Sequence, residues 1–412
     1  MKKLLVIGYV WPEPNSSAAG SRMLQILEVF QQEKYQLTFA SPALETEHMV
    51  NLQSLDIDKV NIDLNDSSFD DFVKQLNPDV VLFDRFMMEE QFSWRVEEQC
   101  PSAMRMLETS DLHCLRHARH QALKTHGNIN QPDYINDIAL REIASILRCD
   151  LSLMISDYEI EILKNIYHVD ETLLFYLPFM HEPIDENIML KSWPAFEERK
   201  NFVTIGNFRH EPNWDSVLYL KREIWPLISS HLKDAEMHIY GAYPPKKASQ
   251  LDNPKERFYV KGWAEDVEAT VSQYRLCLAP LRFGAGIKGK LADAMICGTP
   301  SITTSIGAEA MHAEYEWPGK IADSAEEFSK AAIELYNDKA KWTACQENGI
   351  TIINNIFNKE KHSRRFVEKL NQVLNSLDEV RKNNFTGLML RHHSLKSTKY
   401  MSQWIEAKNK LK

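Results

Sequence analysis

The chain has 412 residues, of which 44% are hydrophobic and 26% charged, and its formal net charge is −10. That length is typical of two globular domains rather than of one core, and no apolar stretch reaches the roughly 18–20 residues that cross a bilayer. The acidic balance argues against a surface that coats nucleic acid, because phosphate binding needs a basic face.

The first half of the chain alternates short β-rich runs with longer amphipathic segments, which is the pattern of an α/β domain. The first run begins near Lys3 and has the charge and apolar character of a short signal peptide, but Pro12 and Pro14 end it early, which favours a strand. Strands are expected at residues 3–9, 36–40, 59–62, 79–84, 103–108, 151–155 and 173–177. Helices are expected at residues 20–33, 67–76 and 138–148. We assign residues 1–185 to this first domain and residues 186–200, where periodicity lapses, to a linker.

A second β/α series follows, with strands expected at residues 202–205, 236–240, 257–260, 276–279 and 301–304. We assign residues 201–365 to this second domain and residues 366–412, which are helical in pattern and basic, to a C-terminal segment. Two doubly wound sheets bind ligands beyond the carboxyl ends of their strands, so the expected site is a cleft between the domains.

The most informative stretch is residues 276–300, which reads strand, glycine loop, helix and a glycine-proline stop. The loop contains Gly284, Gly286 and Gly289, with Lys288 and Lys290 beside them. Glycines let backbone N–H groups approach a ligand, and a helix N-terminus with two lysines favours an anion. The loop therefore predicts a phosphate or diphosphate site.

Two general nucleotide motifs fit this loop only in part. Gly284, Gly286 and Gly289 satisfy the dinucleotide fingerprint G-x-G-x-x-G, with Glu309 about twenty residues on, but that fingerprint follows the first strand of its fold and this loop follows the fourth. The P-loop pattern also fits, but Leu291 stands where Ser or Thr would bind magnesium.

A third template covers more of the chain. Residues 293–309, D-A-M-I-C-G-T-P-S-I-T-T-S-I-G-A-E, resemble the E-A-M-A-x-G-x-P-V-V-x-T-x-x-G-x-E stretch of family 4 glycosyltransferases. Residues 205–215, 260–267 and 149–159 are similar to further motifs of that family, in the same order. The resemblance implies a GT-B fold: two doubly wound Rossmann-like domains that face each other across a cleft, with the C-terminal helix packing back across them. It also implies a retaining, metal-independent hexosyl- or glycosyltransferase of polysaccharide biosynthesis.

Site residues follow from the resemblance. Those expected to bind the donor are Gly20, Gly206, Arg209, Asn213, Gly284, Gly286, Ile287, Lys288, Lys290, Asp293 and Glu309. Two positions depart from the family pattern, because Ala285 replaces the first glutamate of E-x7-E and Asn213 replaces a basic residue. We hypothesise that Lys288 or Lys290 supplies the missing positive charge.

Polar residues also follow the strand expected at 103–108, at its carboxyl end. Related transferases place a histidine or aspartate there against the donor sugar, so His113 and Asp111 are the expected catalytic residues, with Arg116 and Arg119 on the acceptor side. The alternative is structural, since Asp111 could cap a helix that begins at Leu112.

Cofactors and partners are expected as follows. The nucleoside diphosphate-sugar is a substrate, the acceptor is a glycan, a lipid-linked molecule or a small molecule, and neither a cofactor nor a metal ion is expected. The six cysteines lack C-x-x-C or metal-ligand spacing, which indicates reduced thiols in the cytoplasm. The basic C-terminal segment is expected to pack on the domains, with weak peripheral contact at the inner membrane face as the alternative. Two other functions stay open: an NAD(P)-dependent Rossmann enzyme that uses residues 284–289, and a non-catalytic GT-B partner protein.

Overall fold

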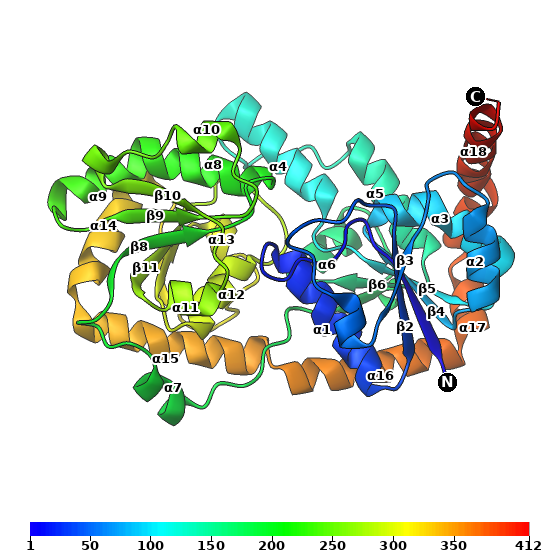
Figure 1. The fold of residues 1–412 in the computed structure, drawn as a ribbon, viewed down its shortest axis with the longest axis horizontal. Helices are drawn as coiled ribbons and strands as arrows, with labels where there is room; N and C mark the ends of the chain where they lie inside the picture. Colours follow the sequence, from blue (N-terminus) through cyan, green and yellow to red (C-terminus); the bar gives the residue numbers. More distant parts are fainter. Residues whose placement is uncertain (412) are drawn as a thin grey trace.

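Seven parallel strands form the sheet of the first domain in this computed structural model, which describes residues 1–411 (Figure 1). The strand order is β3-β2-β1-β4-β5-β6-β7, so the direction of winding changes between β1 and β4. The strands are β1 Lys3–Ile7, β2 Gln36–Ser41, β3 Asp58–Asn61, β4 Val80–Asp84, β5 Met104–Glu108, β6 Leu151–Met154 and β7 Leu174–Tyr176. All seven strands expected from the sequence are confirmed, with ends that differ by one or two residues.

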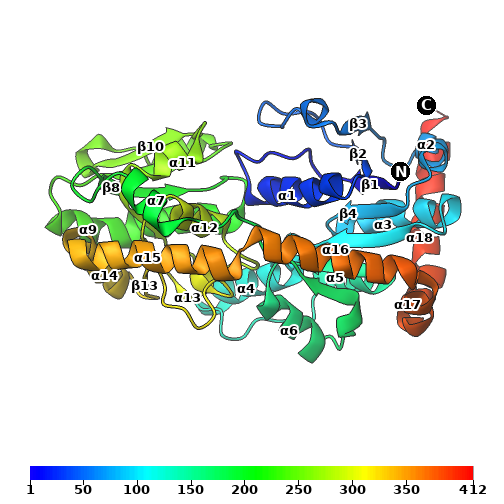
Figure 2. The same cartoon turned by 90° about the horizontal axis from the view of Figure 1, so that it is seen from below.

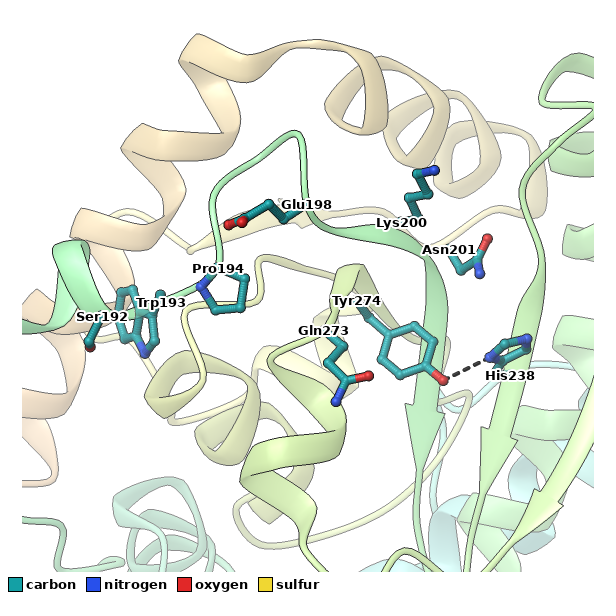
Figure 3. Close-up of a pocket in the computed structure, with 9 residues that line it drawn as sticks. All are labelled: Ser192, Trp193, Pro194, Glu198, Lys200, Asn201, His238, Gln273 and Tyr274. Atoms are coloured by element: carbon teal, nitrogen blue, oxygen red, sulfur yellow. Dashed lines mark hydrogen bonds between the residues drawn. The ribbon is translucent and has the colours of Figure 1, made fainter.

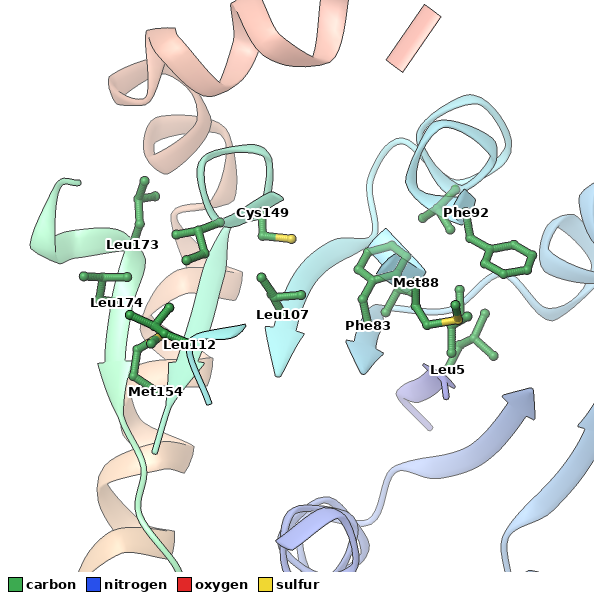
Figure 4. Close-up of a cluster of buried hydrophobic side chains, with 14 of the residues drawn as sticks. Leu5, Phe83, Met88, Phe92, Leu107, Leu112, Cys149, Met154, Leu173 and Leu174 are labelled. Carbon is green, nitrogen blue, oxygen red and sulfur yellow. The ribbon is translucent and has the colours of Figure 1, made fainter. Parts of the chain in front are cut away.

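Helices cover both faces of this sheet, so the inner strands β4, β5 and β6 are buried on both sides, whereas the edge strand β3 is partly exposed. One face forms a core from Leu5, Phe83, Leu107 and their neighbours under α3 and α5 (Figure 4). The opposite face packs Leu4, Val6 and other side chains against α1 and against α16, a helix from the C-terminal segment. The helices of this domain are α1 Ala18–Gln32, α2 Ser68–Leu76, α3 Phe86–Gln99, α4 His113–His126, α5 Asp137–Arg148 and α6 Asp157–Asn165.

The second domain repeats the design with a six-stranded parallel sheet of order β10-β9-β8-β11-β12-β13. The strands are β8 Lys200–Ile205, β9 Met237–Tyr240, β10 Phe258–Gly262, β11 Tyr274–Ala279, β12 Ser301–Thr303 and β13 Gly319–Ile321. The sequence pattern did not predict β13, which has only three residues. The helices are α8 Glu211–Tyr219, α9 Trp225–His231, α10 Lys246–Ser249, α11 Val267–Val271, α12 Gly289–Ile296, α13 Ser305–Ala308, α14 Ala325–Asn337 and α15 Lys339–Ile356.

The chain crosses between the domains twice. The first crossing, near the segment assigned as a linker, contains a short helix, α7 Glu186–Ser192. The second lies between α15, which packs on the second domain, and α16 Lys359–Asn375, whose Phe366 and Leu370 join the core of the first (Figure 2). The two crossings meet where His181 pairs with Asn358 in a parallel bridge.

The basic C-terminal segment packs back on the first domain, as expected, through α17 Leu377–Asn383 and α18 Phe385–Asn409. Arg381 forms two charge-assisted hydrogen bonds to the buried carboxylate of Asp150, at 2.9 and 2.8 Å. The Arg391 side chain is buried nearby. Part of the basic charge therefore stabilises the helix-domain interface. Across residues 1–411, no helix combines the length and apolar character that crossing a membrane requires.

Candidate functional site

The two sheets turn the carboxyl ends of their strands toward each other, and their topological switch points supply the loops between the domains. The glycine loop follows β11, the strand next to β8 at the switch point of the second domain. The turn with Asp111 follows β5 in the first domain and leads into α4. Because β11 is the fourth strand of its domain, the loop does not occupy the first-turn position of a dinucleotide fingerprint.

The glycine loop packs directly on the first domain. Gly286 has a φ of +63°, and a Cβ there would lie 2.8 Å from Cβ of Asp111. Gly289 begins α12, and its Cβ would lie 2.5 Å from Cβ of Ala18. Glycine is therefore required at both positions for the domains to approach. Ala285 and Ile287 are buried beside them, and Ala285 belongs to a core cluster of first-domain side chains.

The two lysines of this loop form hydrogen bonds with different parts of the second domain. Nζ of Lys288 donates to the carbonyl oxygen of Gly286 at 2.7 Å, and Nζ of Lys290 donates to Oδ1 of Asn213 at 2.8 Å. Burial lowers the pKa of each lysine to about 8. A bound anion would raise both pKa values again, so the two ammonium groups are suited to an anionic ligand.

Gly206 and Asp293 complete the second-domain side. A Cβ on Gly206 would lie 2.7 Å from the Asn213 amide and 2.9 Å from Nζ of Lys290, so the backbone, the amide and the ammonium group lie together. Burial raises the pKa of Asp293 to about 7, and the charge of Glu268 adds to the shift, opposed by Lys290.

Two buried glutamates hold the N-terminus of α4. Both carboxylate oxygens of Glu142, on α5, accept backbone N–H groups, from His113 at 3.1 Å and Cys114 at 2.8 Å. Oε1 of Glu159, on α6, accepts from Leu112 and from Gly286 of the other domain, both at 2.8 Å. Burial raises the pKa of Glu142 to about 7 and that of Glu159 to about 8. One carboxylate oxygen thus joins the start of α4 to the glycine loop.

The polar groups expected to be catalytic lie together at this start of α4. Arg116 forms an ion pair with Asp111, and Nε2 of His113 lies 3.5 Å from Oδ1 of Asp111. Burial opposes ionisation of Asp111, but the Arg116 guanidinium outweighs it and holds the pKa of the carboxyl below its usual range. Burial lowers the pKa of His113 to about 3, so its imidazole is neutral at pH 7. The helix begins at His113, and Leu112 occupies the cap position without a side-chain bond, so Asp111 does not cap α4.

His210, at the start of α8, reaches the same place from the second domain. Its imidazole lies close enough to Asp111 and His113 to interact with both electrostatically, and the charges of Arg116 and Lys290 act on it in turn. The surrounding protein and the neighbouring cations Arg116 and Lys290 hold the pKa of His210 below its usual value. The sequence motif around Gly206 contained His210, but nothing in the sequence indicated that it would face Asp111.

Arg119 and Glu309, expected on the acceptor and donor sides, bind each other. Two parallel bonds of 2.8 and 2.7 Å join the guanidinium to the carboxylate, and Arg119 also donates to the carbonyl oxygen of Gly284 at 2.9 Å. Both side chains are largely buried. The structure therefore uses this pair to join α4 to the second domain.

A second set of contacts joins the domains at the loop before α1. Gly20 lets this loop fold against the helix, because a Cβ there would lie 2.5 Å from the Glu13 backbone. The Glu13 carboxylate accepts the Tyr243 hydroxyl at 2.7 Å, and the Trp263 indole N–H donates to the carbonyl oxygen of Asn15 at 2.8 Å. The Arg209 guanidinium lies 3.5 Å from the centre of the Tyr243 ring.

Two cavities lie at opposite edges of the second-domain sheet. The first, of about 330 Å³, is lined by Glu47, His48, Tyr243, Pro244 and Trp263 and lies between the domains, beyond the carboxyl ends of β9 and β10. The second, of about 700 Å³, lies at the opposite, amino edge of the second sheet, where β8 and β11 begin. Figure 3 shows Trp193, Gln273 and Tyr274 around it, with a 2.7 Å hydrogen bond between Tyr274 and His238. None of the residues expected in the site lines this second cavity.

Within residues 1–411, no three His, Cys, Asp or Glu side chains converge so that they could hold a metal ion. Positive charge at the glycine loop comes from Lys288 and Lys290, with Arg116 nearby at the start of α4. Any anion bound at this edge would be held by these side chains and by backbone N–H groups.

Comparison with known proteins agrees with this geometry. Residues 199–338 match the family model described as glycosyl transferases group 1. A comparison with curated protein sequences found no match.

Solved structures show the same fold at low sequence identity. Sucrose-phosphate synthase from Thermosynechococcus elongatus aligns with a TM-score of 0.66 and 14% identity over 91% of this chain and 100% of its own. HepE from Anabaena, in complex with UDP and glucose, aligns with a TM-score of 0.66 and 10% identity over 90% of this chain and 100% of its own. WaaG, a glycosyltransferase involved in lipopolysaccharide biosynthesis, aligns with a TM-score of 0.62 and 12% identity over 87% of this chain and 98% of its own. The GT-B fold expected from the sequence is confirmed.

Proposed function

We propose that this chain, a GT-B protein of the group 1 glycosyltransferase type, transfers a sugar from a nucleoside diphosphate-sugar to a glycan, lipid-linked or small-molecule acceptor. The observation that supports this most is the convergence of Gly206, Lys290 and the glycine loop at the switch point of the second sheet. Backbone N–H groups at the N-terminus of α12 and two lysines there suit a diphosphate.

In this proposal the leaving diphosphate is stabilised without a metal ion. Negative charge develops on its oxygens as the bond to the sugar breaks, and preorganised cations and N–H groups lower the free energy of that state. Lys290 and Lys288 supply the cations. This is also the role that Asn213 leaves unfilled, because it stands where the family pattern has a basic residue, and Lys290 reaches Asn213 directly.

The first domain would act on the sugar. The Asp111 carboxylate is ionised and lies beside the glycine loop, where it would stabilise positive charge at the anomeric carbon. The neutral His113 would hydrogen-bond a sugar hydroxyl. A carboxylate and diphosphate oxygens at the same reacting carbon fit transfer with retention of configuration, which is part of the proposal.

The nucleoside would extend from the diphosphate over the ends of β9 and β10. Mononucleotides lie across these strands in doubly wound sheets, and the cavity lined by Tyr243 and Trp263 is at that edge. HepE was solved with UDP, so UDP is the first nucleotide to test here.

The test is calorimetric titration of the full chain with UDP, GDP, ADP, TDP, NAD and NADP, with and without magnesium. We expect one nucleoside diphosphate to bind, and we expect Lys290→Met to weaken it at least about tenfold, since a charge-assisted hydrogen bond contributes about 1.5–3 kcal/mol. Lys330→Met is the matched control, because Lys330 is exposed on α14 of the same domain. Binding of NAD alone, or equal affinity in the Lys290 variant, would contradict the proposal.

Transfer itself needs a second readout. NMR of the product formed from an anomerically defined donor distinguishes retention from inversion, and activity in excess chelator tests metal independence. Ala285 supports one other function, a non-catalytic GT-B partner, because its position in the family carries a glutamate and here it packs into the first-domain core. Donor binding without turnover over a range of acceptor extracts would favour that function.

A further inference from the structure

The C-terminal helix α18 exposes four large apolar side chains, which is unusual for a helix that only packs on its own domain. It is 25 residues long and lies against α3 and α5, on the end of the first domain that points away from the second (Figures 1 and 2). The side chains buried against the domain are mostly small or polar: Gly387, Arg391, Leu395 and Ser402. Surface helices normally bury their apolar stripe and expose polar residues.

Large apolar residues instead face solvent. Phe385 is 72% exposed, Met389 47%, Tyr400 63% and Trp404 58%. At 3.6 residues per turn these four fall within an arc of roughly 100°. We call this arc, together with Lys396 and Lys408, the outward face of α18. Single exposed apolar residues are ordinary, but two pairs of large apolar residues on one face of a helix, Phe385 with Met389 and Tyr400 with Trp404, indicate an interaction surface.

The inward face is fixed by specific polar contacts, so the orientation of the helix is not arbitrary. Oγ of Ser394 accepts from Arg148 at 3.1 Å, and Oγ of Ser402 accepts from Arg95 at 3.3 Å. Glu406 accepts the hydroxyl of Ser67 at 2.6 Å. These bonds would be lost if α18 rotated to bury its apolar row, because Ser394 and Ser402 would then leave their arginine partners.

The charge of this region is opposite to that of the whole chain. Residues 385–412 contain six basic residues and one acidic residue, whereas the chain carries −10. The acidic residue, Glu406, is held by Ser67 and Lys410, and Lys399 is paired with Glu98. Nζ of Lys408 lies 5.1 Å from the centre of the exposed Trp404 ring. Lysines beside exposed aromatic rings are typical of helices that lie in a membrane interface.

We propose that the outward face of α18 binds the surface of an anionic phospholipid bilayer, with the helix parallel to the membrane plane. Phe385, Met389, Tyr400 and Trp404 would enter the boundary between headgroups and acyl chains, and Lys396 and Lys408 would contact lipid phosphates. A second copy of the chain is the other candidate occupant. A two-fold contact would bring the lysines of the two outward faces together, which opposes association through this face. The proposal does not depend on sugar transfer.

The test is co-sedimentation of the full chain with vesicles of phosphatidylcholine alone or with one third phosphatidylglycerol, at low and high salt. We expect binding only to the anionic vesicles and less binding at high salt. Tyr400→Ser/Trp404→Ser and, separately, Lys396→Glu/Lys408→Glu should each lower the partition coefficient about tenfold or more. Both pairs are exposed, so folding should be unchanged by thermal melting.

Matched control variants change side chains of the same kinds at exposed positions outside α18. Leu44→Ser/Leu227→Ser removes two exposed apolar side chains, and Lys233→Glu/Lys330→Glu reverses two exposed lysines. Brominated phosphatidylglycerol should quench the fluorescence of the wild type, and Trp404→Phe should lose that quenching while it keeps vesicle binding. Equal binding by the outward-face variants and their controls would overturn the proposal. So would a wild-type dimer, measured by light scattering, that Tyr400→Ser/Trp404→Ser dissociates.

Discussion

The glycine loop after β11 and the start of α4 after β5 lie against each other, but they acquire their polar groups in different ways. The loop carries its lysines and glycines within seven consecutive residues, 284–290. The start of α4 depends on carboxylates from other helices, Glu142 on α5 and Glu159 on α6. One side of the site is thus encoded locally, and the other is assembled by the fold.

The two sides also differ in the ionisable groups that they bring to their contact. Lys288 and Lys290 bring ammonium groups to the contact, whereas the start of α4 brings carboxyl groups: Asp111, which is ionised, and Glu142 and Glu159, whose pKa values burial raises to about 7 and about 8. Glu159 accepts the N–H of Gly286, so a carboxylate of the first domain occupies an N–H group of the loop. A bound diphosphate would compete for the same kind of partner. We therefore expect changes at the contacts between the two sides to act on stability and on ligand binding together.

The largest effect is expected for Arg119→Ala, which removes the buried ion pair between α4 and Glu309. Without the guanidinium, the Glu309 carboxylate and the Gly284 carbonyl lose their donor. Removing one partner of a buried ion pair lowers the free energy of unfolding by about 3–5 kcal/mol. Calorimetric melting should show a marked fall in Tm. The matched control is Arg141→Ala, which breaks the ion pair between a half-exposed arginine and Glu90. Because surface ion pairs contribute little, we expect the free energy of unfolding to fall by about 1 kcal/mol or less. A Tm for Arg119→Ala no lower than that of the control would show that the pair does not hold the domains together.

Asp111→Asn tests whether the start of α4 acts on the sugar. Asparagine keeps the shape but removes the charge, so we expect kcat to fall about 100-fold, equivalent to about 2.7 kcal/mol, with KM for the donor little changed. Steady-state kinetics under the conditions established for transfer would measure it. Asp71→Asn, an exposed carboxylate on α2, should leave both constants unchanged. A rise in KM with an unchanged kcat would assign Asp111 to binding alone.

The sequence predicted the fold and the loop side well because their signals are local. Buried parallel strands are continuous apolar runs, and the order of the motifs identified the domain pair. The exception, β13, reads Gly-Lys-Ile and has one apolar residue, so it gave no such run. The lysines and glycines of the loop were likewise visible as neighbours in the sequence.

The α4 side could be predicted only in part, because its contacts join residues far apart in the chain. Asp111 and His113 were found since they follow a strand end. Arg119 and Glu309 were assigned to different ligands, and only the folded chain shows that they bind each other across 190 positions. Glu142 and Glu159 reach the N-terminus of α4 because of how α5 and α6 pack, and their sequence positions give no indication of it.

A pH-dependent effect is expected at Glu159. Its pKa is about 8 in the folded protein and about 4.5 in an exposed glutamate. Between these values the folded state holds one proton more than the unfolded state, so this group lowers stability as pH rises, by at most about 1.4 kcal/mol per pH unit. Asp111 and Glu142 strengthen the shift, and Lys288 opposes it.

Glu159→Gln imitates the protonated form and should remove this dependence. We expect the Tm of the variant to approach that of the wild type near pH 5 and to exceed it increasingly toward pH 8. Glu161→Gln on the exposed side of the same helix is the control and should show a constant difference over this range. A variant less stable than the wild type at pH 8 would mean that the carboxylate is ionised there and that Gly286 and Leu112 depend on its charge.

The smallest effect is expected at the second contact between the domains, where Tyr243→Phe removes the 2.7 Å hydrogen bond to Glu13. One such bond contributes about 1 kcal/mol, and the ring would still lie under the Arg209 guanidinium and make its edge-to-face contact with His48. Tyr243 has a φ of +57°, a conformation that costs energy in a non-glycine residue and persists only while its neighbours hold it. We therefore expect a Tm lowered by a few degrees or less and a slightly larger radius of gyration in small-angle scattering, with Tyr9→Phe unchanged in both. If scattering shows instead that Arg119→Ala leaves the domains closed and Tyr243→Phe opens them, the contact at the loop before α1, and not the buried ion pair, sets the distance between the two sides of the site.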